Sequence, residues 1–169
     1  MCAYAQMLGP QYPGRTVIAT VDTDLVALFM VHGGPSASVC LMHHEQRNRM
    51  CIDTAVLSKA LAAPPYRLSV SEFVIVSAVK GTDFTPKAIT GLPDWHATLC
   101  FAGRFLRASS RPIVEDGVLC MIVFDRMVND IVLSSPRAKA AKLTKQDRDS
   151  FTFIAQYWLK LHDPSTKTE

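Results

Sequence analysis

Residues 16 to 24 read TVIATVDTD, an apolar, β-branched run that ends on two aspartates. A run of this kind is typical of a strand that is buried on both faces of a parallel sheet. Asp22 and Asp24 follow the run directly, so we expect both carboxylates at the carboxyl end of the strand. Open α/β sheets bind their ligands at these ends, which makes the two aspartates candidate site residues.

Short strands and helices are expected to follow this first strand. The hydrophobic spacing predicts strands over residues 39–42 and 50–52, and helices over residues 53–63, 70–80, 95–106, 116–132 and 150–161. Pro64-Pro65 ends the first helix, and Ser69 with Glu72 forms a capping box that starts the second. Gly81 ends the second helix and leaves Asp83 in the loop beyond it. The predicted fold class is α/β, with a mostly helical C-terminal half.

The composition is that of a globular domain. Of the 169 residues, 49% are hydrophobic and 20% are charged, which is enough apolar material for a core of ordinary size. The net charge of +3 permits a nucleic-acid partner without demanding one. The five cysteines are scattered, without the close pairs that zinc sites use, and no apolar stretch reaches the roughly 18–20 residues of a membrane span. We therefore expect a reduced, intracellular protein with no membrane partner.

Asp22, Asp24 and Asp83 form a set of carboxylates that suits a divalent metal ion. Two acids one residue apart, with a third in another loop, repel one another unless a cation neutralises them. Mg²⁺ takes oxygen ligands, and a carboxylate cluster that holds two metal ions activates water and stabilises the leaving oxygen in phosphodiester cleavage. The alternative is structural, because Asp-x-Asp pairs at strand ends are common and Asp after a glycine is a usual turn residue. Spacing alone leaves both interpretations open.

Two longer segments resemble the flap endonuclease/XPG family of structure-specific nucleases. TVIATVDTDLVALF (residues 16–29) is similar to the family's strand with its paired metal-binding aspartates, and SVSEFVIVSAVKGTDFTPKAITGLP (residues 69–93) to its helix, Gly-x-Asp-aromatic motif and glycine loop. The resemblance covers roughly residues 2–106. It implies a PIN-like, mainly parallel sheet flanked by helices, with a helix-two-turn-helix-like element. On this similarity Asp22, Asp24 and Asp83 are catalytic and bind Mg²⁺ or Mn²⁺, and Phe84 replaces the usual tyrosine.

The same resemblance implies a DNA partner, a branched or flap duplex. The family's glycine loop presents backbone groups to a DNA phosphate, often through a monovalent cation, and Gly91 takes that place here. Leu92 and Pro93 follow it where the family has a second glycine, so the close approach of backbone to phosphate is altered. Basic residues around this region are candidate phosphate contacts, with solvated surface charge as the equal alternative: Lys80, Lys87, Arg104 and Arg107.

The resemblance divides the chain into a C-terminal part of a PIN-like nuclease domain (residues 1–110), a helical extension (residues 111–163) and a polar tail (residues 164–169). The family's glutamate pair and earlier acids would precede Met1, so we expect a fragment, a split gene product or a reduced homologue. A partner chain would then supply the missing acidic ligands. The implied function is a metal-dependent, structure-specific DNA endo- or exonuclease, in the nucleus or at a site of DNA replication or repair.

Two other functions remain open. Without the missing ligands, the chain could be a catalytically incomplete DNA-binding or interaction module derived from this family. The run Asp22-Thr23-Asp24-Leu25-Val26 also fits haloacid-dehalogenase-like phosphatases, in which the first Asp is the nucleophile and the second is a general acid. That class needs a downstream lysine and an acidic pair for magnesium, and Asp83 supplies one acid of the pair.

Three further groups of residues have simpler, structural interpretations. His32, His43 and His44 are expected to be exposed loop residues rather than metal ligands, because no paired cysteines accompany them. The basic run from Arg137 to Lys145 is expected to be solvated, with contact to a DNA backbone as the alternative. Four aromatic residues at helical spacing are expected to pack in the core rather than to stack on bases: Phe151, Phe153, Tyr157 and Trp158.

Overall fold

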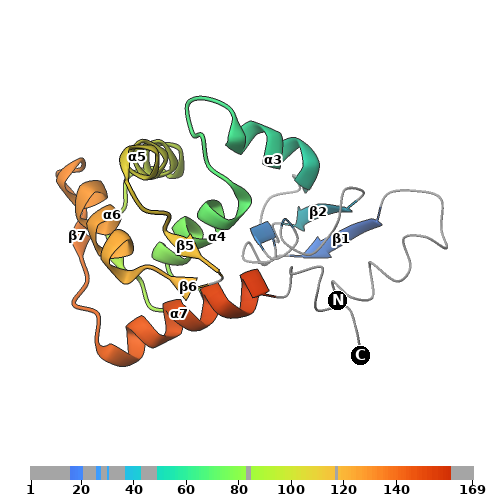
Figure 1. The fold of residues 1–169 in the computed structure, drawn as a ribbon. Helices are drawn as coiled ribbons and strands as arrows, with labels where there is room; N and C mark the ends of the chain where they lie inside the picture. The colour runs from blue at the N-terminus through green and yellow to red at the C-terminus, as the bar shows by residue number, and fades with distance from the viewer. Residues whose placement is uncertain are drawn as a thin grey trace, which may run out of the picture. The chain divides into compact units, whose positions relative to one another are not determined.

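The structure is a computed structural model and describes residues 16–20, 26–27, 30, 37–42, 49–82, 85–116 and 118–160. It is a mixed α/β fold in which helices predominate (Figure 1). The chain divides into two compact units, residues 1–60 and residues 61–169. The α/β class and the mostly helical C-terminal half that the sequence predicts are therefore confirmed.

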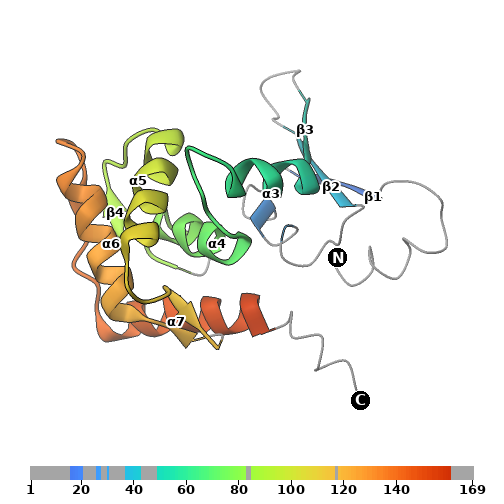
Figure 2. The same cartoon turned by 45° about the horizontal axis from the view of Figure 1, so that its top comes forward.

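The strands of the first unit form a three-stranded sheet in the order β1-β2-β3 (Figure 2). β1 (Thr16–Thr20) pairs with β2 (Ala37–Met42) in parallel, and β2 pairs with β3 (Arg49–Asp53) antiparallel. Connection length explains the two directions, because a parallel crossover needs about a dozen residues or more. Residues 21–36 provide that length, and residues 43–48 do not. The expectation of a mainly parallel sheet is thus wrong for the described strands, which form a mixed sheet.

α3 (Thr54–Ala62) begins directly after β3. The Asp53 carboxylate accepts hydrogen bonds from the backbone N–H groups of Ala55 (3.0 Å) and Val56 (3.2 Å), two donors that have no partner within the first turn of a helix. The cis peptide bond of Pro64-Pro65 lies just beyond its end. The helix predicted over residues 53–63 is confirmed, with Asp53 as its N-terminal cap.

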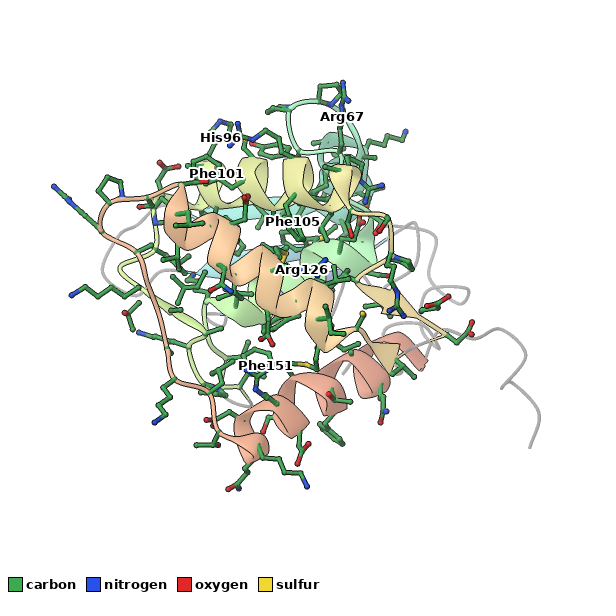
Figure 3. The ribbon with its side chains drawn as sticks, turned by 60° about the vertical axis from the view of Figure 1, so that its left-hand side comes forward. Arg67, His96, Phe101, Phe105, Arg126 and Phe151 are labelled. Carbon is green, nitrogen blue, oxygen red and sulfur yellow. The ribbon has the colours of Figure 1, made fainter. Side chains whose placement is uncertain are left out.

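The second unit is built mainly from α4 (Val70–Val79), α5 (Trp95–Ala108), α6 (Met121–Leu133) and α7 (Lys145–Lys160). α4 has buried side chains on most of its surface, as a helix in the middle of a core must have. α5 packs against α6. The ring centroids of Phe124 in α6 and Phe151 in α7 are 4.9 Å apart, and Figure 3 shows the Phe151 side chain pointing towards α6. None of the described helices is long and apolar enough to cross a membrane.

The core of this unit draws on residues from Leu61 to Ala155 along its described chain. Its largest fully buried side chains are Leu61, Leu68, Ile75, Ile89, Ile113, Phe124, Met127, Ile131 and Phe151. Ile89 lies in β4 (Ile89–Thr90), which pairs antiparallel with β7 (Lys139–Ala140). This pairing joins the segment that precedes α5 in the sequence to the segment that follows α6.

A hairpin precedes α6. β5 (Val114–Glu115) pairs antiparallel with β6 (Val118–Leu119), and Asp116 at the turn has a positive φ of +51°. Two-residue hairpin loops favour Asp-Gly because their central residues need positive φ. The prediction of a helix over residues 116–132 therefore places its start too early. The hairpin occupies the first of these residues, and α6 begins at Met121.

α7 begins earlier than the predicted residue 150. Asp147 accepts hydrogen bonds from the Thr144 N–H (2.7 Å) and the Thr144 hydroxyl (2.8 Å), and its own N–H donates to that hydroxyl (3.1 Å). These bonds, the backbone one first, hold the pKa of the Asp147 carboxyl below its ordinary value of 3.8. The reciprocal cap satisfies free N–H groups at the helix start and extends α7 to Lys145.

Two aromatic residues of α7 lie in different environments. Phe151 is 1% exposed and belongs to the core, whereas Phe153 is 57% exposed. The prediction of a core position is confirmed for Phe151 and wrong for Phe153. The side chains of Tyr157 and Trp158 lie outside the described residues.

Candidate functional site

The three predicted metal ligands, Asp22, Asp24 and Asp83, lie outside the described residues, as do Phe84 and the three predicted loop histidines. β1 ends at Thr20, shortly before the first two aspartates, at the edge where its parallel neighbour β2 also ends. Among the described residues, no group of three or more His, Cys, Asp or Glu side chains could hold a metal ion. The metal site stays a prediction, and three carboxylates are a donor set that suits Mg²⁺ or Mn²⁺.

Two threonines hold the chain on either side of residues 83–84. Gly81 follows α4 with φ of +90°, a left-handed conformation that suits glycine. The Thr82 N–H donates to the Thr85 carbonyl (3.0 Å), and the Thr85 N–H donates to the Thr82 hydroxyl (3.1 Å). The buried Thr85 hydroxyl also donates to a carbonyl in the last turns of α4, at 3.3 Å. Both ends of this loop are therefore anchored to α4.

Gly91 has a structural reason to be glycine. Its φ is +63°, and a Cβ atom at this position would overlap the backbone carbonyl of Arg137. The close approach continues the pairing of β4 with β7, in which Thr90 lies opposite Lys139. Packing against another strand accounts for glycine here, whether or not a phosphate binds. The predicted contact of Gly91 with DNA stays a prediction.

Lys80 and Lys87 are exposed, and both lie next to the turn at Gly81. Lys80 caps the C-terminal end of α4, with its Nζ 5.7 Å from the centroid of the Trp95 ring at the start of α5. Lys87 packs beside Gly81, where an added Cβ would come within 2.7 Å of the lysine Cγ. Within the described part of the chain neither lysine has an ion pair with an acid. Both ammonium groups are available to an anionic ligand.

Arg104 belongs to a different surface from these lysines. It lies nine positions after Trp95 in α5, about 14 Å along a helix axis. Its guanidinium lies 4.9 Å from the centroid of the Phe101 ring, and it borders a cavity of 440 Å³ that Arg67 and Arg107 also line. The basic residues that the sequence groups together are thus divided between the two ends of α5.

The turn after α3 is fastened to α5 along that second surface. A Cβ at Gly103 would overlap the backbone carbonyl of Tyr66, so the helix and the turn meet backbone to backbone. The Tyr66 hydroxyl lies 2.7 Å from Nδ1 of His96, whose Nε2 is 3.8 Å from the Cys100 sulfur. Figure 3 shows Arg67 and His96 on the side of α5 that faces away from α6. These contacts give the residues around the cavity a structural role.

Arg107, which borders this cavity, also joins α5 to α4 through an ion pair. Arg107 near the end of α5 pairs with Glu72 in the first turn of α4, and the Glu72 side chain is 14% exposed. Glu72 also accepts a hydrogen bond from the Ser69 N–H at 2.7 Å, as the predicted capping box requires. The Arg107 charge is therefore compensated within the protein. Arg67 and Arg104 have no ion pair with an acid among the described residues.

The β4–β7 pairing brings further basic residues next to residues 91–93, the Gly91 loop. The sequence did not reveal that these residues lie there. Thr90 donates its hydroxyl hydrogen to the Lys139 carbonyl at 3.4 Å, across 49 positions of sequence. Arg137, Lys139 and Lys142 are all exposed, as either solvated charge or contact with a DNA backbone requires. Their place beside Gly91 has no sequence signal, because β4 and β7 are two residues long each and lack any recognisable strand pattern.

Comparison with known proteins adds no family to this geometry: no protein-family model, no curated protein and no solved structure matches the chain.

Proposed function

We propose that this chain is a divalent-metal-dependent DNA nuclease of the flap endonuclease type, with a PIN-like domain that acts on branched or flap duplexes inside the cell. Asp22, Asp24 and Asp83 are the proposed ligands of Mg²⁺ or Mn²⁺. A bound ion would supply a Lewis acid that lowers the pKa of a water molecule and neutralises charge on the leaving oxygen. The haloacid-dehalogenase-like alternative needs a later acidic pair for magnesium, and the motif at Asp83 supplies one acid of that pair.

The observation that supports this proposal most is the form of the α4–α5 segment. α4 starts with a capping box, and the chain then turns at two left-handed glycines, Gly81 and Gly91. α5 begins after Asp94, whose carboxylate accepts a hydrogen bond from the Ala97 N–H at 2.9 Å. Two capped helices joined through two glycine turns are compatible with a helix-two-turn-helix element and support the proposal in that sense.

Lysines are the proposed anchors for the DNA backbone. Helix N-termini commonly bind phosphate through free N–H groups, but Asp94 already occupies such a group at the start of α5 and adds a negative charge. Lys80 and Lys87 lie on either side of Gly81 and have no competing ion pair among the described residues. Contacts of this kind would position the duplex without reading its sequence.

The test is cleavage of a labelled panel of flap, nicked and four-way DNA by the full chain in Mg²⁺ or Mn²⁺. We expect metal-dependent cleavage that the Asp22→Ala/Asp83→Ala variant loses, because the proposed ligand set is then broken. Asp149→Ala, which removes an exposed carboxylate from α7, is the matched control and should cleave as the wild type does. Thermal unfolding of all three proteins separates loss of ligands from loss of fold.

A catalytically incomplete DNA-binding module is the second candidate, favoured by the exposed lysines around Gly91. Titration with Mn²⁺ distinguishes it from the nuclease. Salt-sensitive DNA binding without cleavage, together with equal Mn²⁺ affinity in the wild type and the double variant, would contradict the nuclease and support the module.

A further inference from the structure

The pairing of β4 with β7 creates a narrow two-stranded ribbon beside Gly91. Ile89 lies opposite Ala140 and Thr90 opposite Lys139. The Ala141 N–H donates to the Ala88 carbonyl at 2.9 Å, which extends the same register by one pair. One further position in the same register would set Lys87 opposite Lys142. The pairing therefore brings the backbone of the Lys87 segment next to that of the segment with Lys139 and Lys142.

The ribbon carries positive charge without compensation. Residues 85–93 contain Lys87 and no acid, and residues 134–146 contain Arg137, Lys139, Lys142 and Lys145 and no acid. The side chains of all five are exposed, and none has an ion pair among the described residues. Like charges opposite one another destabilise an antiparallel pair. A bound anion would remove this repulsion.

The backbone beneath these charges is held in place. The carbonyl of Arg137 lies so close to Gly91 that a Cβ does not fit between them, and Ile89 and Ala138 are both buried. Lys139 to Lys142 spans at most about 10 Å of extended chain, close to the axial length of about three base pairs. Cations spaced over this length of backbone can reach successive phosphates of one DNA strand.

We propose that Lys87, Arg137, Lys139 and Lys142, the basic ribbon, bind the sugar–phosphate backbone of duplex DNA. The proposal rests on the nuclease function and deepens it, because it assigns part of the DNA surface to the helical C-terminal segment. The ribbon holds the duplex beside the Gly91 loop and is indifferent to base sequence. Each lysine that contacts a phosphate releases a condensed cation.

The test is fluorescence anisotropy of the full chain with a labelled duplex at several salt concentrations, in EDTA so that no metal or cleavage is needed. Lys139→Gln/Lys142→Gln removes two charges and keeps much of each side chain. The slope of log affinity against log salt should become shallower by about 2, since each phosphate contact contributes about 0.9. The loss of affinity should be equal for two unrelated sequences.

The matched control is Arg111→Gln/Arg126→Gln, which removes two exposed charges outside the ribbon. Its slope should change by less than half as much. An equal change in control and ribbon variants would overturn the proposal, as would no DNA binding by the wild type. Ribbon-dependent binding to phosphatidylserine vesicles that is tighter than binding to duplex would overturn it too. Circular dichroism melting establishes that both variants are folded.

Failure of the ribbon and failure of the nuclease give different results. If the wild type cleaves DNA and the ribbon variant keeps the full salt slope, the nuclease stands and the ribbon is overturned. If binding depends on the ribbon and no metal gives cleavage, the ribbon is supported and the chain is a DNA-binding module.

Discussion

At the scale of single residues, Gly103 couples α5 to a turn that lies far away in sequence. Its Cα faces the carbonyl of Tyr66 so closely that a side chain at this position would overlap it. Glycine inside a helix ordinarily weakens the helix, because it loses more backbone freedom on folding than any other residue. The close contact explains why the sequence nevertheless has glycine here.

We expect Gly103→Ala to lower the free energy of unfolding by about 1–3 kcal/mol, because the added methyl group forces helix and turn apart. Urea denaturation measures the change. The sign of this change is informative by itself. Helix propensity alone would make the alanine variant more stable by about 1 kcal/mol, so a loss of stability must come from the contact. A more stable variant would contradict the backbone contact.

Gly91 is a second glycine whose identity is explained by a close backbone contact. The sequence assigns it to DNA binding, and the structure gives it a packing role against the Arg137 carbonyl. A side chain at this position would be strained by the φ of +63° as well. The lysines around the loop are therefore better probes of DNA binding than Gly91 itself.

At the scale of elements, the start of α7 depends on a charged cap. Hydrogen bonds from Thr144 favour the ionised form of Asp147 and lower its pKa. Because the folded pKa lies below the unfolded one, this stabilisation is present above about pH 4 and is lost as the pH falls through the folded pKa. The helix terminus is thus sensitive to acid.

We expect Asp147→Asn to lower the melting temperature at neutral pH, and the difference from the wild type to shrink as the pH falls below about 4. Thermal unfolding across this pH range measures it. Asp149→Asn, an exposed change in the same helix, is the control and should give a smaller difference at neutral pH. A gap between wild type and Asp147→Asn that is constant with pH would argue against the ionised cap.

At the scale of the whole molecule, the contact between α6 and α7 joins the C-terminal helix to the core of the second unit. Phe124 is fully buried, and its ring lies 4.9 Å from that of Phe151. Phe153 lies two positions further along α7 and is 57% exposed. The two α7 phenylalanines therefore provide a direct comparison of buried and exposed aromatic area.

We expect Phe151→Ala to cost about 3–5 kcal/mol of unfolding free energy, because it removes transfer energy and leaves a cavity. Phe153→Ala should cost less than about 1 kcal/mol, because substitutions of exposed residues usually change stability by about 0.5 kcal/mol or less. Chemical denaturation of both variants gives the comparison. Equal losses would mean that α7 packs through a different face.

Local chemistry explains why much of the fold could be predicted. The capping box of Ser69 and Glu72, the stop at Pro64-Pro65 and the glycine that follows α4 act within a few residues, so the pattern itself specifies them. Asp116-Gly117 carried a hairpin signal of the same local kind, which the apolar spacing of the next helix obscured. Thr144 and Asp147 likewise marked the true start of α7.

The sequence by itself determined the α/β class, the helices from α3 to α7 in outline, and the carboxylates and lysines proposed for metal and DNA. Only the tertiary structure decided that β3 runs antiparallel, that Arg104 lies away from the Gly91 loop, and that Arg137, Lys139 and Lys142 lie beside that loop. The physical reason is the distance in sequence between the residues that interact. Caps and turns are stabilised by neighbours in the chain, whereas the pairing of two-residue strands is stabilised by a core that forms only when distant segments meet.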